Sequence, residues 1–425
     1  MRAARIVVAA WGSFGDLHPH LALAIGLRDR GHRVIVASAP PFREAVERVG
    51  VEFHPIRPDL PDRVGNEALF ARMMDRRSGT EFIVRSLVAP AVRQTYADIE
   101  EVAAGADLMV TGMLAFGAAF FAEQNGIPRV STALQPSALF SLYDPPSGDL
   151  LPGVELLRRL PRRALRPLTG LVRLATDPWF VPLARFRAEI GLPPTPINPF
   201  LGGTVSPVLH LALFSPVFAR PQPDWPTQTV ATGFPFEPRV DGSTLPNALA
   251  RFLDDGTPPI VFTLGSSAVY APGAFWERSI EAVRALGHRG VLLVGPDRET
   301  MFPKAGADVI AVGWAAHSAL FLRAAAVVHQ GGIGTTAQAL RAGVPMLVVP
   351  YAHDQPDNAR RVAELGVALR LAADRYTARA AVDALARILD DPSFSARAAS
   401  IAQAIRAEDG VGRGCEAIEA VLDGR

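Results

Sequence analysis

The chain has 425 residues, of which 49% are hydrophobic and 20% charged, a globular composition with enough apolar material for two domain cores. The formal net charge is +1 and the arginines are scattered, which argues against a nucleic-acid-binding surface. Cys415 is the one cysteine, which excludes an internal disulfide framework and a cysteine-rich metal site. No apolar run reaches the ~20 residues of a membrane-spanning helix. We therefore expect a cytoplasmic protein, for which peripheral contact with a membrane and the oligomeric state stay open.

The first elements predict a βαβ unit. The apolar run 5–10 is typical of a buried strand, and it ends in Gly12-Ser-Phe-Gly15-Asp16. Apolar residues at helical spacing follow as far as Gly31, and a second buried strand covers 33–37. Further strands are predicted at 108–110, 129–133 and 208–214. This alternation favours an α/β fold with a parallel sheet.

The second half of the chain repeats the same pattern after two proline-rich stretches. Residues 140–200 predict irregular helices and loops, and 216–239 a linker. Strands are then predicted at 259–265, 290–295, 308–312, 325–328 and 345–350. We expect two Rossmann-like domains, 1–215 and 240–425, with parallel sheets facing across a ligand cleft, and the last helix able to pack back on the first domain.

The run His329-Gln-Gly-Gly-Ile-Gly-Thr-Thr336 follows a strand and opens a helix. Glycines at 331, 332 and 334 allow a tight turn and close approach of a ligand. Thr335 lies near the helix start, where free N–H groups favour an anion, and His329 could donate to a phosphate oxygen. These groups predict a diphosphate site. The alternative is an ordinary strand–helix turn.

Asp354 and Gln355 come just after the predicted strand at 345–350. An adjacent carboxylate and amide, with His353 beside them, can hold the vicinal hydroxyls of a sugar. The alternative, equally supported by the residues, is that Asp354 only caps the following helix.

Asp16 and His18 follow the first strand, at the edge where ligands bind. A carboxylate there could accept a proton from an attacking hydroxyl. The alternative is that Asp16 is a helix-capping residue, since Pro19 sits in the first helical turn. His18 and His20 compete with it for the role of base.

Weaker signals are Ser266 and Ser267, which follow a strand, and Trp314, whose indole could stack on a nucleobase or lie in the core. A nicotinamide site is disfavoured because Gly12–Gly15 lacks the three-glycine spacing and the acid expected ~20 residues later. No His, Asp and Glu cluster has metal-ligand spacing.

Together these motifs resemble the family 1 glycosyltransferases of the two-Rossmann (GT-B) type. The glycine turn, Gly343-Val-Pro345 and the Asp354–Gln355 pair stand in the family's order. Within the family the chain is similar to the bacterial rhamnosyltransferases that make rhamnolipids, and to lipid, sterol and natural-product transferases. This similarity rests on Gly12–Asp16, Gly31–Val34, Pro223–Pro226, Thr232–Pro235 and Val261–Ser266.

The resemblance implies a role for each matching residue. His329, Gly331, Gly332, Gly334 and Thr335 would bind the donor diphosphate, and Asp354 and Gln355 the donor sugar. Trp314, with Ala315 and Ala316 beside it, would pack on the base, and Ser266 and Ser267 would form a phosphate-side loop. Asp16 would be the general base. The segment Thr111-Gly112-Met113 lacks the acid that orients a catalytic histidine in many relatives, and His317 replaces a common glutamine.

The resemblance further implies an inverting transfer of a sugar, with rhamnose or glucose favoured, from a dTDP- or UDP-sugar to a hydrophobic acceptor. The donor is a co-substrate, and no tightly bound cofactor or metal is expected. Phe82, Phe116, Phe140 and Trp179 would line the acceptor site. The alternatives are a nucleotide-sugar epimerase, a retaining transferase and a non-catalytic nucleotide-binding partner protein.

Overall fold

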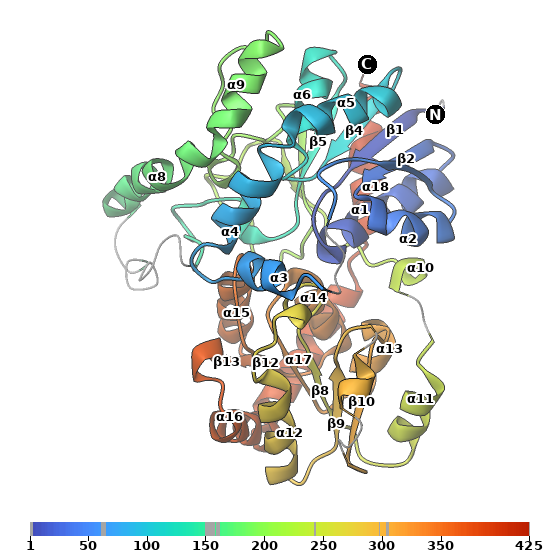
Figure 1. The fold of residues 1–425 in the computed structure, drawn as a ribbon, viewed down its shortest axis with the longest axis vertical. Helices are drawn as coiled ribbons and strands as arrows, with labels where there is room; N and C mark the ends of the chain where they lie inside the picture. The colour runs from blue at the N-terminus through green and yellow to red at the C-terminus, as the bar shows by residue number, and fades with distance from the viewer. Residues whose placement is uncertain are drawn as a thin grey trace. The chain divides into compact units, whose positions relative to one another are not determined.

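The computed structural model describes residues 3–60, 65–148, 158, 162–241, 244–296, 298–302 and 306–424. The chain divides into two compact units, each built around one sheet (Figure 1). Unit 1 takes in residues 1–62, 77–240 and 408–425, and unit 2 takes in residues 63–76 and 241–407.

Unit 1 contains a seven-stranded sheet in the order β3-β2-β1-β4-β5-β6-β7. All of its strand pairs are parallel. The strands are β1 (Arg5–Ala9), β2 (Arg33–Ser38), β3 (Glu52–Pro55), β4 (Leu108–Thr111), β5 (Arg129–Ala133), β6 (Leu209–Ala212) and β7 (Thr229–Ala231). The central strands are apolar on both faces because helices cover both sides, as in parallel sheets generally.

Unit 2 contains a six-stranded parallel sheet in the order β10-β9-β8-β11-β12-β13. Its strands are β8 (Ile260–Thr263), β9 (Gly290–Leu293), β10 (Val309–Val312), β11 (Ala326–His329), β12 (Met346–Val348) and β13 (Ala368–Arg370). The predicted α/β class with two parallel sheets is confirmed.

Each sheet reverses its strand order at one point, between β1 and β4 in unit 1 and between β8 and β11 in unit 2. Loops on the two sides of such a point diverge, so a crevice opens beyond the carboxyl ends of the strands. The turns that the sequence singled out at Gly12–Asp16, Gly265–Ser267 and His329–Thr335 follow β1, β8 and β11. They therefore occupy these two crevices.

Helices cover both faces of each sheet (Figure 1). In unit 1 they are α1 (Phe14–Asp29), α2 (Arg43–Arg48), α4 (Gly79–Phe82), α5 (Val92–Ala103), α6 (Phe116–Gln124), α8 (Arg162–Thr176), α9 (Val181–Glu189) and α18 (Gly410–Asp423). In unit 2 they are α3 (Glu67–Met73), α11 (Asn247–Asp254), α12 (Phe275–Ala285), α13 (His317–Leu320), α14 (Ile333–Ala342), α15 (Gln355–Glu364), α16 (Ala378–Asp390) and α17 (Pro392–Arg406). The chain passes from unit 1 to unit 2 at α10 (Pro238–Asp241).

The shorter helical turns complete the description. One π-helical segment spans Ile83–Val88. The 3-10 turns are Pro40–Phe42, Pro136–Ala138, Asp177–Phe180, Pro199–Leu201, Ala268–Tyr270, Glu299–Met301, Phe321–Arg323 and Ala373–Arg375.

The last helix, α18, packs on α1 within unit 1. Cys415 is fully buried there, with its Sγ 3.7 Å from the carbonyl oxygen of Leu23. Glu419 accepts from Arg30 at 2.8 Å and lies 3.2 Å from His32 Nε2. Burial raises the pKa of the Cys415 thiol to about 12, so this cysteine is a packing residue.

Two segments lie elsewhere than the sequence suggests. Residues 65–76, early in the chain, belong to unit 2, where Phe70 contacts Tyr270 with ring centroids 5.2 Å apart. Strand β7 lies inside the stretch 216–239 that the sequence presents as a linker. Like β3 and β13, which the sequence also did not reveal, β7 is a short, partly exposed edge strand. Its sequence shows no apolar run because its side chains are partly exposed at the edge of the sheet.

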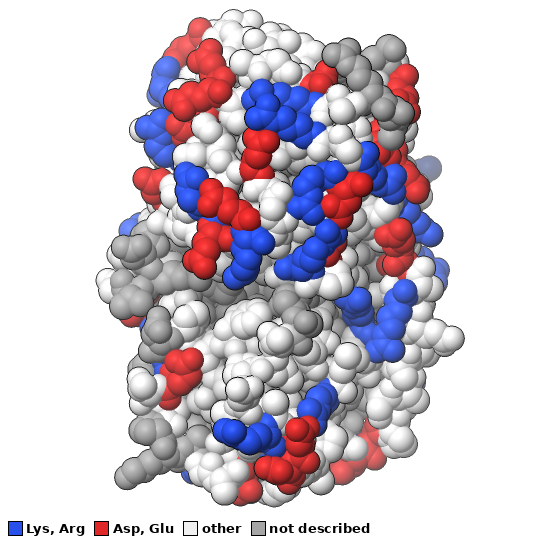
Figure 2. Space-filling model, turned by 90° about the vertical axis from the view of Figure 1, so that its right-hand side faces the viewer, with Lys and Arg blue, Asp and Glu red and all other residues white. Residues whose placement is uncertain are grey.

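Charged side chains of both signs are interspersed on the face shown in Figure 2. Within the described part of the chain, no helix is long and apolar enough to cross a membrane. The same residues contain no group of three or more His, Cys, Asp and Glu that could hold a metal ion.

Candidate active site

A cavity lies at the strand-order reversal of unit 1. The empty space in it and at its mouth, open solvent included, is about 330 Å³. The lining comes from α1 and from the segments after β1, β4 and β5, and consists of Ala10, Trp11, Asp16, His20, Gly112, Met113, Leu114, Leu134, Gln135 and Ala138. Six of these ten residues are apolar and two are titratable, the mixture typical of a small-molecule site.

Asp16 reaches this cavity from the first turn of α1, where it also closes a capping box. Its Oδ2 accepts from the backbone N–H of Ser13 at 2.7 Å and from the Ser13 hydroxyl at 3.0 Å. Ser13 Oγ in turn accepts from Gly15 N at 3.1 Å. The capping alternative and the cavity position are therefore both true of Asp16. Burial raises the pKa of this carboxyl, and the bonds from Ser13 oppose that shift.

The glycine at position 12 makes this geometry possible. It has φ +144°, and a Cβ placed there would lie 2.3 Å from Asp16 Oδ2. Only glycine leaves room for the carboxylate beside the end of β1.

The two histidines of the same turn differ in position. His20 lines the cavity, with Nδ1 2.6 Å from the carbonyl oxygen of Asp16 and Nε2 2.8 Å from Thr132 Oγ1. Burial lowers its pKa, so the ring is neutral with its proton on Nδ1. His18 is not among the lining residues. Its ring packs on Phe14, with centroids 5.1 Å apart. Burial, and secondarily Arg48, lowers its pKa to about 4.

The aromatic residues expected to line an acceptor site do not line this cavity. Phe116 and Trp179 are core residues that each contact Phe180. Phe140 packs against Leu165 and Leu168. The positions of Phe116 in α6 and of Trp179 just before α9 direct both side chains into the interior. The scattered aromatics of the sequence did not reveal this.

In unit 2 the turn from β11 to α14 has the features of an anion site. Gly331 has φ +89°, and a Cβ there would lie 2.9 Å from Val348 Cγ1 and 3.0 Å from the carbonyl oxygen of Gln355. Gly332 is the N-cap of α14 and makes no side-chain cap. The N–H groups of the first turn, at Ile333, Gly334 and Thr335, are thus left for a ligand.

His329 ends β11 and is fully buried. The backbone N–H of Gly331 donates to its Nδ1 at 3.0 Å, so the proton of the neutral ring is on Nε2. Nε2 is buried and has no hydrogen-bond partner in the described part of the protein. Burial, with a contribution from His317, lowers the pKa of His329 to about 3. The ring is therefore a neutral donor with one unsatisfied N–H.

Gln330 is a site residue that the sequence did not single out. A Cβ at Gly265 would lie 2.2 Å from its Nε2, and a Cβ at Gly332 would lie 2.7 Å from the same atom. The buried Gln330 amide thus fits against both glycine turns, and it brings the loop of Ser266 and Ser267 next to the β11–α14 turn. Only the tertiary structure shows this contact. In the sequence, the feature that could have pointed to Gln330 is its position directly before Gly331 and Gly332.

The loop after β12 presents Asp354 and Gln355. Asp354 stands at the N-cap of α15 but makes no cap bond, and instead accepts from Asn358 Nδ2 at 2.5 Å. Asp354 thus has the N-cap position that one of the two alternatives gave it, but its side chain does not cap the helix. Gln355 is buried, and its Oε1 accepts from the N–H groups of Tyr351 and Ala352 at 2.8 and 3.1 Å.

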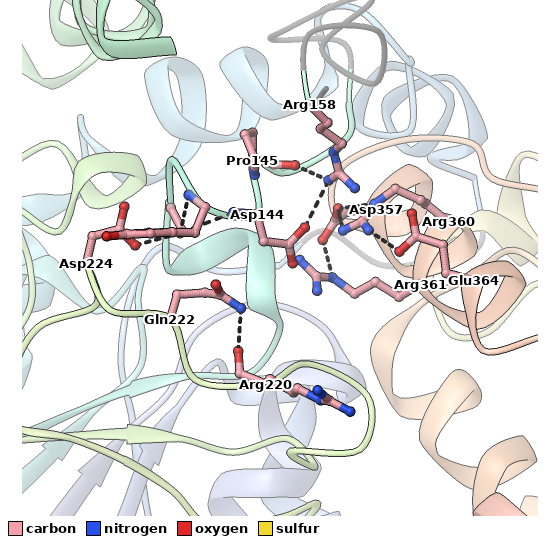
Figure 3. Close-up of polar contacts among 12 residues, drawn as sticks. Asp144, Pro145, Arg158, Arg220, Gln222, Asp224, Asp357, Arg360, Arg361 and Glu364 are labelled. Atoms are coloured by element: carbon pink, nitrogen blue, oxygen red, sulfur yellow. Dashed lines mark hydrogen bonds and ion pairs between the residues drawn. The ribbon is translucent and has the colours of Figure 1, made fainter. Parts of the chain in front are cut away.

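The backbone of this loop is strained at one residue, and side-chain contacts hold the loop in place. His353 has φ +60°, the one non-glycine residue with positive φ among those described, and such strain is kept where the surroundings enforce it. In the first turns of α15, the fully buried Asp357 accepts from Arg360 at 2.9 Å and from Arg361 at 2.7 Å (Figure 3). Asn358 Nδ2 also donates to the carbonyl oxygen of Gly331 at 2.9 Å, which ties this loop to the glycine turn.

Trp314 follows β10 and its side chain is 56% exposed, so the core alternative for this residue is wrong. The neighbours Ala315 and Ala316 are buried and anchor the segment. An exposed indole at the carboxyl end of a strand is available to stack on a planar ligand.

Two family models match this chain, one in each half of the sequence. Residues 6–142 match the glycosyltransferase family 28 N-terminal domain. Residues 281–411 match the C-terminal domain of erythromycin biosynthesis protein CIII-like proteins.

Similar proteins span the whole chain. The chain is 32% identical to the O-mycaminosyltylonolide 6-deoxyallosyltransferase of Streptomyces fradiae, over 98% of this chain and 97% of that protein. It is 34% identical to the vancomycin aglycone glucosyltransferase of Amycolatopsis orientalis, over 95% and 94%. The crystal structure of the glycosyltransferase VinC in complex with dTDP has the same fold, with a TM-score of 0.68 and 23% identity over 99% of this chain and 100% of that one. The chain therefore belongs to the family 1 glycosyltransferases of the GT-B fold, and it is a nucleotide-sugar-dependent hexosyltransferase.

Proposed function

We propose that the protein transfers a sugar, with inversion, from a dTDP-sugar to a hydroxyl group of a hydrophobic natural product. The observation that carries this proposal is the apolar cavity of unit 1 with the Asp16 carboxylate in its wall. Such a cavity can receive the hydroxyl-bearing end of an acceptor among apolar side chains, where the hydroxyl meets a base.

Asp16 is the general base of this proposal. Both bonds from Ser13 use Oδ2, which leaves Oδ1 for the acceptor hydroxyl. As the hydroxyl oxygen forms a bond to the anomeric carbon, its proton passes to Asp16 and the bond from that carbon to the diphosphate oxygen breaks. A direct displacement of this kind inverts the anomeric centre. The sequence offered His18 as a second catalytic residue. Because it does not line the cavity, we give it a supporting role only.

The donor binds to unit 2 in this proposal. The first-turn N–H groups of α14 and the unpaired Nε2–H of His329 stabilise the charge that grows on the departing diphosphate. Ser266, Ser267 and Gly334 contribute to the same diphosphate site. Trp314 stacks on the base, and Asp354 and Gln355 bind the sugar hydroxyls.

Thymidine is the proposed base and a 6-deoxyhexose such as rhamnose the proposed sugar. The support is the 6-deoxyallosyl transfer in the name of one relative and the dTDP in the VinC structure. Glucose, the sugar in the name of the vancomycin aglycone enzyme, is the second candidate. The acceptors in those names, a tylonolide derivative and the vancomycin aglycone, support a bulky natural product rather than a simple lipid.

The test is a matrix of dTDP- and UDP-sugars against polyketide and glycopeptide aglycones. The measured quantities are acceptor-dependent release of the nucleoside diphosphate and the anomeric configuration of the product by NMR. We expect release only with acceptor, strongest with a dTDP-sugar, and an inverted product. A retained configuration overturns the mechanism. Conversion of the donor without acceptor favours an epimerase instead.

A further inference from the structure

Helix α8 has two apolar faces rather than one. Its inner face consists of Leu165, Leu168 and Val172, all buried. Leu165 and Leu168 pack against Phe140 and Leu142 of unit 1. This face is enough to hold the helix to the unit, so the structure does not need a second one.

The outer face carries Pro167, Leu171 and Leu174, spaced at i, i+4 and i+7 on one side of the helix. Leu174 is 78% exposed and Leu171 56% exposed, among the most exposed large hydrophobic side chains of the described residues. Val181, the first residue of the next helix, α9, is 43% exposed. In Figure 1 helix α8 lies at the periphery of unit 1, in keeping with the exposure of Leu171 and Leu174.

A row of arginines runs beside the exposed leucines. Arg163, Arg166 and Arg173 are exposed, and none has an acidic partner among the residues that the structure describes. The helix itself contains four arginines and no Asp or Glu. Other arginines nearby are occupied. Arg158 forms an ion pair with Asp144 at 3.3 Å (Figure 3), and Arg162 lies over the Tyr143 ring at 4.3 Å.

We propose that the outer face of α8 binds an anionic phospholipid membrane surface. An amphipathic helix with exposed leucines beside unpaired arginines suits the interface, where the apolar side chains enter the acyl region and the guanidinium groups meet lipid phosphates. A nucleic acid would use the arginines but leave Leu171 and Leu174 in water. The whole chain has a formal net charge of only +1, so this attraction is local to α8. The proposal does not rest on the proposed donor or acceptor.

The test is co-sedimentation of the full-length protein with vesicles of pure phosphatidylcholine and of phosphatidylcholine mixed with phosphatidylglycerol. We expect binding to the mixed vesicles to be at least tenfold tighter than to the neutral ones, and to weaken at high salt. The double variant Leu171→Ser/Leu174→Ser and the triple variant Arg163→Gln/Arg166→Gln/Arg173→Gln should each lose most of it. Leu322→Ser, which changes an equally exposed leucine of unit 2, should bind as the wild type does.

Two results would overturn the proposal. One is equal sedimentation of wild type and the Leu171/Leu174 variant. The other is a concentration-dependent dimer, detected by light scattering without vesicles, that the same variant abolishes, because the face would then bind a second copy of the chain. All variants change exposed side chains, and unchanged thermal unfolding confirms that each is folded.

Discussion

The Oδ2 atom of Asp16 accepts two hydrogen bonds from Ser13, so one carboxylate both closes the capping box of α1 and forms part of the cavity wall. Burial raises the pKa of Asp16 while Ser13 lowers it, and the balance between these effects sets the pH range in which a base at this position is ionised. Helix capping and the proposed proton transfer therefore depend on the same carboxylate.

Asp16→Asn separates activity from stability. Loss of the base should lower kcat on the order of 10²–10⁴-fold. A carboxyl whose folded pKa is raised stabilises the fold at low pH, and this contribution is lost as pH rises through the folded pKa. The free energy of unfolding at neutral pH should therefore not fall in the Asn variant, whose amide oxygen can still accept from Ser13. If the variant is strongly destabilised instead, the capping bonds of the ionised carboxylate stabilise the fold by more than its burial costs.

Ser13→Ala removes the hydroxyl bond to Asp16, one of the contacts that lower its pKa, and keeps the bond from the backbone N–H of residue 13. We expect the pKa to rise further and the acid limb of the kcat/KM profile to move to higher pH, with a loss of about 1 kcal/mol of stability. Thr377→Ala is a matched control, because Thr377 also caps a helix, α16, by accepting from Ala380 N. It should cost similar stability and leave the pH profile in place. An identical shift in both variants would contradict a specific link between Ser13 and Asp16.

His329→Asn tests the unpaired Nε2–H. A hydrogen bond to a charged phosphate contributes about 1.5–3 kcal/mol, so the Kd for dTDP, measured by calorimetry, should rise roughly 10–100-fold. Because the pKa of His329 is about 3, the wild-type affinity should show no step from this ring between pH 5 and pH 8. His210→Asn is the control. That ring is also buried with an unpartnered Nε2, but it lies in unit 1, and dTDP affinity should be unchanged.

Trp314→Ala tests the stacking role of an exposed indole. Stacking on a base contributes roughly 1–3 kcal/mol, so the variant should bind dTDP about 5–100-fold more weakly. Stability should change by no more than about 0.5 kcal/mol because the side chain is exposed. Leu322→Ala, at a comparably exposed position, should leave the affinity as it is. Weakening of dTDP binding in both variants would point to a general change of unit 2.

Asp354→Asn tests recognition of the donor sugar apart from the nucleotide. If the carboxylate holds the sugar hydroxyls, kcat/KM for the dTDP-sugar should fall roughly tenfold or more while the Kd for dTDP stays constant. The bond from Asn358 can persist to the amide oxygen, so the loop should keep its shape. A parallel loss of dTDP affinity would instead indicate that Asp354 acts by ordering the turn at Gly331.

The sequence by itself determined the α/β class, the two sheets and the turns at 12–16, 329–335 and 354–355, because buried parallel strands are continuous apolar runs and a ligand-binding turn needs glycines and polar groups at fixed spacing. It did not reveal the edge strands β3, β7 and β13, because their side chains are partly exposed and their sequences form no such run. Nor could it choose between capping and cavity positions for Asp16, place Trp314 at the surface, or identify Gln330 and the outer face of α8. These depend on which side chains, distant in sequence, come within a few ångströms of each other, and only the packing of helices and loops on the sheets decides that.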